Sequence, residues 1–303
     1  MIGGGKVAYV FPGQGSQWVG MGRDLYSSSP QARKVFEEAD STLGFPLSQL
    51  CFEGPEEMLR QTVNAQPAIL AVSIAYLRAS PRLQDRDNAP AFLAGHSLGE
   101  YTALVAAQVL DFTDAIYLAS ERGRLMQEAG EKAPGGMAAI LGLDEASVND
   151  ICQPTGTQIA NINCPGQIVI SGSTQALAQA IELAKTKGAR RAIPLQVSGA
   201  FHTPLMQSAV EGLSQVISRV AFHEPLIPIV ANTTAQPITD AEAVKDELLN
   251  QLCHCVQWQR SIEYMIEEGV STFIEIGPGQ VLTGLIKRID KDVQALSIEG
   301  QRE

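Results

Sequence analysis

Short apolar runs alternate with amphipathic stretches along the chain, and this alternation constrains the fold more than any other feature of the sequence. The runs 6–11 (KVAYVF) and 91–94 (AFLA) are typical of buried strands. Each is followed by a turn and then by stretches with helical spacing, as at 30–43 and 98–107. Strands that alternate with helices form a sheet covered by helices, so the sequence predicts an α/β fold.

The section from Gly135 to Gln196 has a different order of elements. Strands are expected at 137–143, 158–162, 167–171 and 190–197, and helices at 145–152 and 174–187. The order β-α-β-β-α-β is that of a ferredoxin-like unit. We therefore expect a small ferredoxin-like subdomain, residues 131–197, inserted into a large α/β subdomain made of residues 1–130 and 198–303.

Charge and hydropathy disfavour two classes of protein. Lys and Arg number 22 against 33 Asp and Glu, a formal net charge of −11, whereas nucleic-acid-binding proteins normally carry a basic excess. The sequence has no run of 18 apolar residues that would span a membrane. Residues 1–7 contain one lysine and no long apolar stretch, unlike a secretory signal, so a cytoplasmic protein is expected.

The five cysteines are an odd number in a long chain, which argues against a disulfide scaffold. Cys253-His254-Cys255 could belong to a metal site, but no second pair of ligands stands at a suitable spacing. Structural packing is the favoured interpretation, and no metal site is expected.

The sharpest local motif is Gly95-His96-Ser97-Leu98-Gly99, a G-x-S-x-G between an expected strand and an expected helix. This context is that of a nucleophile elbow and predicts an α/β-hydrolase-like large subdomain. Glycines two positions either side of Ser97 remove the Cβ atoms that would collide in such a tight turn. The Leu98 amide and the helix dipole would then face a developing oxyanion.

A serine nucleophile needs a base, and four histidines are available: His96, His202, His223 and His254. His202 follows an expected strand end, and strand ends gather at one edge of an α/β sheet, where sites form. Spacing alone leaves two interpretations open for His202, a catalytic base and a buried structural imidazole.

Two further segments could contribute to this site. Arg122 lies on an otherwise mostly apolar helix beside Gly123 and could pair with a carboxylate, although by pattern alone a pair with Glu121 or a neighbouring acid is favoured. The segment 11–17 (FPGQGSQ) lacks the lysine of a P-loop, so an oxyanion contact from the Gln14 amide fits better than a phosphate site.

Several ordered motifs together resemble the malonyl-CoA:acyl-carrier-protein transacylases and the related polyketide synthase acyltransferase domains. They are 11–17 (FPGQGSQ), 66–68 (QPA), 95–101 (GHSLGEY), 122–123 (RG), 161–167 (NINCPGQ), 199–202 (GAFH), 256–258 (VQW) and 275–279 (EIGPG). The resemblance covers nearly the whole chain.

The resemblance implies a role for each site residue. Ser97 would be the acylated nucleophile, and His202 would be its general base and acid. Gln14 and Leu98 would supply the oxyanion-hole amides, Arg122 would hold the malonyl carboxylate, and the Gln257 carbonyl would orient His202. Gln66, Asn161 and Asn163 would line the cleft, and Phe201 follows the malonyl-type pattern rather than the serine usual in methylmalonyl-selective relatives.

The implied reaction is a ping-pong transfer of malonyl from malonyl-CoA to the phosphopantetheine thiol of acyl carrier protein. The CoA thioester is a substrate, and no cofactor is expected. Carrier proteins of this kind are generally acidic, so docking on this acidic chain would need a local basic patch. Lys185, Lys187, Arg190 and Arg191 form the densest basic cluster; a solvated helix end is the equally open alternative.

Three other functions are alternatives to malonyl transfer. A serine esterase or acyl-thioester hydrolase would share the nucleophile, base and oxyanion hole, but no acid between Ser97 and His202 stands in a recognisable motif. A trans-acting polyketide acyltransferase would use the same residues. A non-catalytic binding subunit is disfavoured by the presence of Ser97, His202 and Arg122 together.

Overall fold

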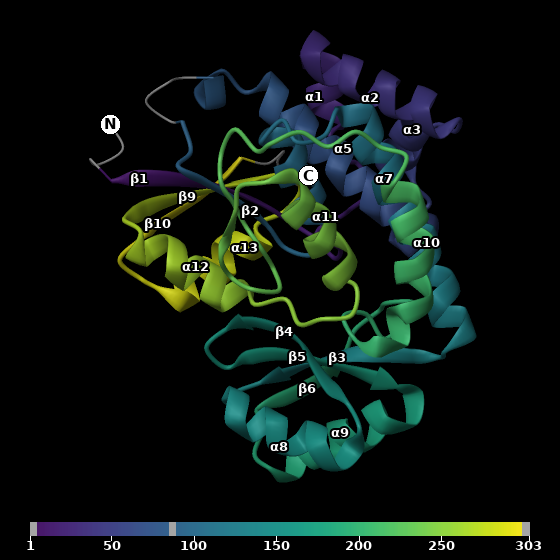
Figure 1. The fold of residues 1–303 in the computed structure, drawn as a ribbon, viewed down its shortest axis with the longest axis vertical. Coiled ribbons are helices and arrows are strands. Elements are labelled where there is room, and N and C mark those ends of the chain that lie inside the picture. The colour runs from purple at the N-terminus through teal and green to yellow at the C-terminus, as the bar shows by residue number, and fades with distance from the viewer. Residues whose placement is uncertain (1–4, 85–88, 299–303) are drawn as a thin grey trace.

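The computed structural model describes residues 5–84 and 89–298 and contains two sheets, each with its own helices (Figure 1). Residues 1–4, part of the segment compared with a secretory signal, lie outside the described residues. Within the described ranges, no helix is long and apolar enough to cross a membrane.

The larger sheet has the strand order β10-β9-β1-β2-β7-β8. Its strands are β1 (Lys6–Phe11), β2 (Phe92–Gly95), β7 (Ile229–Val230), β8 (Pro237–Ile238), β9 (Val270–Ile276) and β10 (Gln294–Ile298). All neighbouring strands pair in parallel except β7 and β8. The sheet therefore has the parallel core that the sequence predicts.

Helices cover both faces of this sheet. They are α1 (Arg23–Ser28), α2 (Pro30–Leu43), α3 (Leu47–Glu53), α4 (Glu56–Arg60), α5 (Thr62–Ala79), α6 (Gly99–Ala106), α7 (Phe112–Lys132), α10 (Gln207–Ile217), α11 (Ala241–Asn250), α12 (Trp258–Glu267) and α13 (Val281–Ile289). Two 3₁₀ turns, η1 (Pro81–Gln84) and η3 (Pro204–Met206), complete the set in the described chain.

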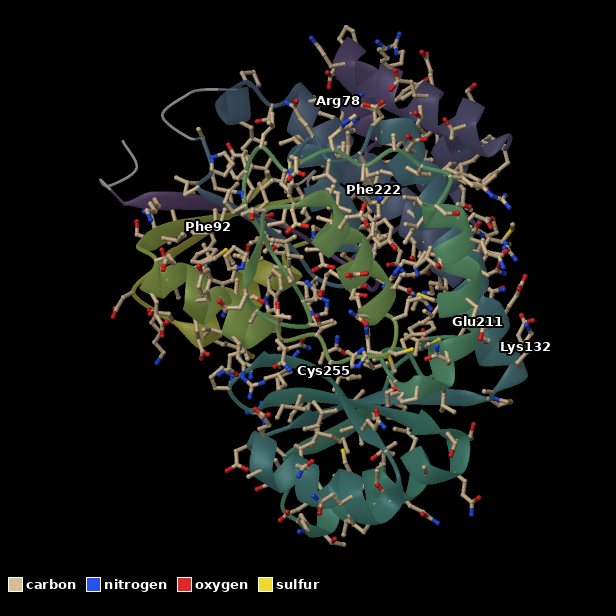
Figure 2. All side chains as sticks on the ribbon, viewed as in Figure 1. Arg78, Phe92, Lys132, Glu211, Phe222 and Cys255 are labelled. Atoms are coloured by element: carbon tan, nitrogen blue, oxygen red, sulfur yellow. The ribbon has the colours of Figure 1, made fainter. Side chains whose placement is uncertain are left out.

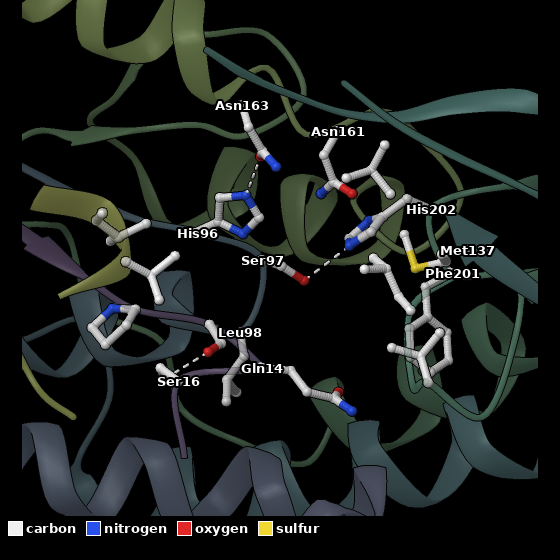
Figure 3. A pocket seen from close by; sticks show the side chains of 18 of the residues that line it. Gln14, Ser16, His96, Ser97, Leu98, Met137, Asn161, Asn163, Phe201 and His202 are labelled. Carbon is white, nitrogen blue, oxygen red and sulfur yellow. Dashed lines mark hydrogen bonds between the residues drawn. The ribbon is translucent and has the colours of Figure 1, made fainter. Parts of the chain in front are cut away.

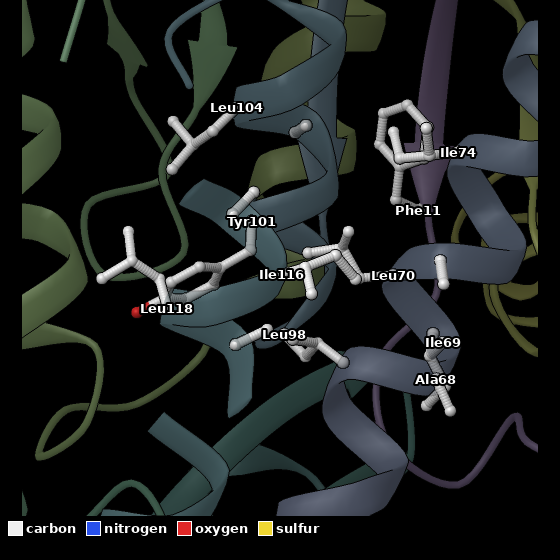
Figure 4. Close-up of a cluster of buried hydrophobic side chains, with 14 of the residues drawn as sticks. Phe11, Ala68, Ile69, Leu70, Ile74, Leu98, Tyr101, Leu104, Ile116 and Leu118 are labelled. Atoms are coloured by element: carbon white, nitrogen blue, oxygen red, sulfur yellow. The ribbon is translucent and has the colours of Figure 1, made fainter. Parts of the chain in front are cut away.

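Alternate side chains of β1 point into different layers of the core. Val7, Tyr9 and Phe11 pack against α2, α5, α6 and α7, whereas Ala8 and Val10 pack against α12 and α13. Figure 4 shows Phe11 facing Leu70 and Ile74 of α5. Burial on both faces explains why β1 is a continuous apolar run rather than an alternating one.

The ends of α2 illustrate how local sequence sets the helix boundaries. The Ser29 side chain accepts a hydrogen bond from the Ala32 amide, and Pro30 occupies the first helical position. Gly44 ends the helix with φ 71°, a left-handed conformation that favours glycine. These bounds agree with the sequence prediction.

The smaller sheet, with the order β4-β5-β3-β6, is antiparallel throughout. It consists of β3 (Gly135–Leu141), β4 (Gln158–Cys164), β5 (Gln167–Ser173) and β6 (Arg191–Pro194), with helices α8 (Glu145–Thr155) and α9 (Thr174–Thr186). This is the ferredoxin-like arrangement, and it has its own hydrophobic core. The exact boundaries proposed for the two subdomains, 131 and 197, stay predictions.

The small sheet contacts the rest of the chain through the segment 251–257, which follows α11. Val256 pairs with β4: the Ile162 amide donates to its carbonyl at 2.9 Å, and its own amide donates to Ala160 O at 2.8 Å. Figure 2 places Cys255 between the small sheet and the large body. Arg260 on α12 adds an ion pair to Glu145 at 2.8 Å.

One expected strand is shorter in the structure. The strand expected at 190–197 ends at Pro194, because Leu195 and Val197 turn toward the cleft that they line.

Candidate active site

Ser97 lies in a tight turn between β2 and α6, with φ 51°, a conformation rare for residues other than glycine. The turn is possible because two glycines flank it. A Cβ on Gly95 would lie 1.8 Å from the Gly99 carbonyl carbon, and a Cβ on Gly99 would lie 2.1 Å from Phe11 O. The elbow predicted from G-x-S-x-G is therefore present, and strain is concentrated at the serine.

His202 faces Ser97 across the cleft, although the two residues are 105 positions apart. The distance from Ser97 Oγ to His202 Nε2 is 2.9 Å (Figure 3). The other ring nitrogen, Nδ1, lies 2.7 Å from the Gln251 carbonyl oxygen. Because a carbonyl only accepts, Nδ1 carries the proton and Nε2 is free to accept the serine proton.

The prediction that the Gln257 carbonyl orients His202 is wrong, since the carbonyl in contact is that of Gln251. Gln257 instead donates its amide to Asn232 O at 2.7 Å, and its side chain contacts Arg260. Any residue could supply a backbone carbonyl, so the sequence carried no signal that would have distinguished Gln251.

Arg122 is 1% exposed and adjoins the nucleophile. Its Nη2 donates to Ser97 Oγ at 3.1 Å and to Gln251 Oε1 at 2.7 Å, and its Nη1 donates to Gln66 Oε1 at 2.7 Å. The pairing with Glu121 is wrong, because Glu121 binds Arg124 at 2.7 Å. Arg122 Nε is buried and has no hydrogen-bond partner in the described chain.

Gln66, predicted to line the cleft, does not do so. It is fully buried and reaches Arg122 from behind, with its Nε2 against Met126 Sδ at 3.4 Å. Its contact with the cleft is therefore indirect, through the arginine.

Gln14 and Leu98 line the same cleft as Ser97. Within the described ranges, neither amide donates to a protein acceptor. The Gln14 loop packs closely on the elbow, since a Cβ on Gly13 would lie 2.3 Å from His96 O. Two amides without protein acceptors in residues that line the cleft with Ser97 are compatible with the oxyanion hole that the sequence predicts.

Asn232, which the sequence reasoning missed, fixes the elbow. Its Oδ1 accepts from the Ser97 amide at 2.7 Å, and its Nδ2 donates to Gly95 O at 2.7 Å. Its own amide donates to Glu100 Oε1 at 2.6 Å. The sequence of the segment 231–235 does not indicate this role, because asparagine in a loop is common.

Burial sets the protonation of the site. Desolvation, followed by the positive charge of Arg122, lowers the pKa of His202 to about 3, so the imidazole is neutral near pH 7. Burial also lowers the pKa of His96, whose Nε2 donates to Asn163 Oδ1 at 2.9 Å. Burial lowers the pKa of Arg122 from its ordinary value.

The cleft has a volume of about 210 Å³ and lies between the two subdomains. The large subdomain contributes Ser97, Arg122 and Phe201, and the small one contributes Asn161 and Asn163, so both predicted asparagines line it. Figure 3 shows Asn161 and Asn163 descending toward His202 and His96.

The basic cluster lies on the small subdomain. Lys185 pairs with Glu182 at 2.5 Å, and Lys187 pairs with Asp150 at 3.5 Å. Arg190 and Arg191 are exposed, and neither has an acidic partner within the described ranges. The two arginines therefore carry the unpaired positive charge of the cluster.

His254 and Cys253 do not form a metal centre with their neighbours. His254 Nδ1 lies 2.8 Å from Asn250 O, and Cys253 Sγ is nearest to Gln207 Oε1 at 3.8 Å. No group of three or more His, Cys, Asp and Glu side chains suited to a metal ion occurs in the described part of the chain.

The chain is similar to known acyl transferases in sequence and in structure. Residues 8–301 match the family model described as an acyl transferase domain. The malonyl CoA-acyl carrier protein transacylase of Bacillus subtilis is 46% identical over 298 residues, covering 97% of this chain and 93% of that relative.

Two solved structures are similar over almost their entire length. The acyl carrier protein S-malonyltransferase of Vibrio cholerae has a TM-score of 0.93 and 43% identity, covering 98% of this chain and 97% of that one. A malonyl-transacylase solved in complex with a type II polyketide synthase acyl-carrier protein has a TM-score of 0.94 and 42% identity, covering 98% and 96%.

Proposed function

The chain belongs to the acyl transferase family, and from that premise we propose that it is a malonyl-CoA:acyl-carrier-protein S-malonyltransferase. It moves malonyl from malonyl-CoA to the phosphopantetheine thiol of acyl carrier protein through a malonyl ester on Ser97. The observation that carries this proposal is the placement of Ser97 Oγ within hydrogen-bond distance of both His202 Nε2 and Arg122 Nη2.

The first half-reaction acylates the serine. The malonyl carboxylate binds the Arg122 guanidinium, which brings the thioester carbonyl to Ser97. Ser97 Oγ attacks that carbonyl while His202 Nε2 takes its proton, and the oxyanion is held by the Gln14 and Leu98 amides. When the C–S bond breaks, His202 returns the proton to the departing CoA thiolate.

The second half-reaction reverses these roles. The carrier-protein thiol gives its proton to His202 and attacks the malonyl ester, and the proton then passes to Ser97 Oγ as the C–O bond breaks. The CoA thioester is a substrate throughout, and the scheme needs no cofactor.

The partner of His202 argues against the hydrolase alternative. A serine hydrolase of this type holds the histidine with a carboxylate, whereas here Nδ1 donates to the Gln251 carbonyl. Arg122 beside the nucleophile suits an acyl group that ends in a carboxylate. The cytoplasmic location of the protein stays a prediction.

Intact-mass analysis tests the acyl-enzyme directly. The protein is mixed with malonyl-CoA without carrier protein, and we expect one malonyl adduct per chain that carrier protein then removes. Ser97→Ala should carry no adduct. Adduct formation on Ser97→Ala, or sustained CoA release in the absence of carrier, would contradict the proposed transferase.

For the carrier protein we propose docking near Lys185, Lys187, Arg190 and Arg191, with the two arginines supplying most of the attraction. The two lysines already have acidic partners, so their charge is largely compensated within the protein. Arg191 pairs with Leu141 of β3, which in turn pairs with Gln167, a residue that lines the cleft. The strand that carries Arg191 therefore lies two positions from the strand of a cleft-lining residue, which supports a carrier that approaches on this side.

Charge reversal separates docking from chemistry. Arg190→Glu with Arg191→Glu should slow malonyl transfer to the carrier by about tenfold or more at low salt, while Ser97 acylation by malonyl-CoA stays unchanged. Arg219→Glu, an exposed arginine of the large subdomain outside the cleft lining, is the control. Equal effects on both half-reactions would refute this docking surface.

A further inference from the structure

The side-chain amide of Gln251 is held between a buried cation and a buried carboxylate. Its Oε1 accepts from Arg122 Nη2 at 2.7 Å. Its Nε2 donates to Ser97 O at 3.0 Å and to Glu100 Oε2. Gln251 is fully buried, so no solvent replaces these partners.

The orientation of the Gln251 side-chain amide decides whether Arg122 meets a hydrogen-bond acceptor or a donor. With Oε1 on the guanidinium, the amide supplies an acceptor that holds Nη2 beside Ser97 Oγ. With the amide turned over, an NH₂ group would face the guanidinium, and two donors would meet in a buried site. The orientation is therefore set by whatever holds Nε2 on the opposite side.

Glu100, in the first turn of α6, holds that side together with the Ser97 carbonyl oxygen. It is 2% exposed, and each of its two oxygens accepts from an N–H group. Oε1 accepts from the Asn232 amide at 2.6 Å, and Oε2 accepts from Gln251 Nε2. Glu100 does not line the cleft, so it acts on the substrate only through its neighbours.

We propose that Glu100 is a positioning residue that fixes the orientation of the Gln251 side-chain amide and thereby sets Arg122 to receive the carboxylate of the acyl group. This inference rests on the proposed function, because it concerns selectivity for acyl groups that end in a carboxylate. A glutamine at position 100 must present its NH₂ group to one of the two N–H donors, so it cannot satisfy both.

Glu247 offers a matched control. It is 6% exposed, and its oxygens accept from the amide and hydroxyl of Thr233, the residue next to Asn232. Its side chain makes no hydrogen bond to Gln251 within the described ranges, whereas its backbone carbonyl, which the substitution keeps, accepts from the Gln251 amide at 2.8 Å. Glu247→Gln therefore perturbs a second buried carboxyl group, on α11, whose side chain does not contact the side-chain amide that faces Arg122.

The test compares single-turnover acylation of Ser97 by malonyl-CoA and by acetyl-CoA, which lacks the carboxylate. A general loss of structure lowers both rates, whereas a misplaced Arg122 lowers the ratio of malonyl to acetyl rates. Contacting residues couple by a factor of about 2 to 150, and we expect the ratio to fall about tenfold in Glu100→Gln. The ratio should stay unchanged in Glu247→Gln.

A double-mutant cycle identifies the route of the effect. In a Gln251→Met background, which keeps the backbone carbonyl on His202, Glu100→Gln should change the ratio by less than about twofold. If Glu100→Gln does not fold, as judged by thermal unfolding, Glu100→Asp replaces it, because its shorter carboxylate cannot reach both donors.

Several results would overturn the inference. An unchanged ratio in a folded Glu100 variant, an equal fall in Glu247→Gln, or a full tenfold effect in the Gln251→Met background would each do so. Failure of the proposed function would look different, because the wild-type protein would then take up no malonyl group or would release CoA continuously without carrier protein.

Discussion

Replacing Arg122 with methionine should convert a malonyl-selective site into one that favours neutral acyl groups. Methionine fills a similar buried space but offers no hydrogen-bond donor. Arg122 is 1% exposed and within 3.1 Å of Ser97 Oγ, so its charge acts on the substrate in a dry environment. The carboxylate of a malonyl group would then be buried without a partner.

The size of the effect follows from that burial. Removing one partner of a buried charge pair typically costs about 3–5 kcal/mol, which corresponds to roughly 150- to 5,000-fold in kcat/KM for malonyl-CoA. Acetyl-CoA has no carboxylate and should change by less than about tenfold. The side-chain amide oxygens of Gln66 and Gln251 lose their donor as well. The free energy of unfolding should therefore fall by about 1–3 kcal/mol for each unsatisfied group.

Rapid-quench measurement of Ser97 acylation with both thioesters gives the ratio of the malonyl-CoA rate to the acetyl-CoA rate directly. Arg124→Met is the control, since Arg124 lies on the same helix but pairs with Glu121 and Glu128 at the surface. We expect that variant to behave like the wild type. If Arg122→Met lowers both rates equally, the assignment of Arg122 to carboxylate recognition is refuted.

Two further predictions concern the base and the elbow. Because burial and Arg122 lower the pKa of His202 to about 3, the Ser97 acylation rate should vary by less than about twofold between pH 5 and pH 7, whereas an ordinary histidine would impose a loss of about 25-fold. An acid limb near pH 6.5 in the single-turnover rate would contradict this. Gly95→Ala should yield no folded protein in a thermal unfolding assay, because its Cβ would lie 1.8 Å from the Gly99 carbonyl carbon. Gly44→Ala, where φ is 71° and no atom is near, should fold with a loss of about 1 kcal/mol; equal stability of the two variants would refute the steric argument.

The elements that the sequence predicts well are those with local signals. The bounds of α2 follow from Ser29-Pro30 at one end and Gly44 at the other, and the elbow follows from the glycines around Ser97. His202 was placed by a weaker argument, the gathering of strand ends at one edge of the sheet. The short helices α3 and α4 and the strand β10 were missed, since their few residues carry little periodicity.

The contacts that sequence reasoning missed depend on backbone groups or on distant partners. His202 is oriented by a carbonyl, which every residue possesses, so only the path of the chain after α11 selects Gln251. Asn232 holds the Ser97 amide from 135 positions away. Neither role requires a distinctive residue pattern, and both follow from how the loop 231–235 and the segment 251–257 pack beneath the elbow.

The carbonyl partner of His202 also has a physical reason that concerns Arg122. A carboxylate at Nδ1 would favour the protonated imidazole and raise its pKa, and it would introduce a negative charge close to the guanidinium. That charge would compete with the substrate carboxylate for the same cation. A neutral carbonyl from Gln251 fixes the ring and its tautomer without this competition, while the Gln251 side chain gives Arg122 a neutral acceptor. Glu100 reaches Arg122 only through the Gln251 side-chain amide, so the substrate carboxylate is the anion that contacts the guanidinium directly, and the same residue that orients the base leaves the cation available.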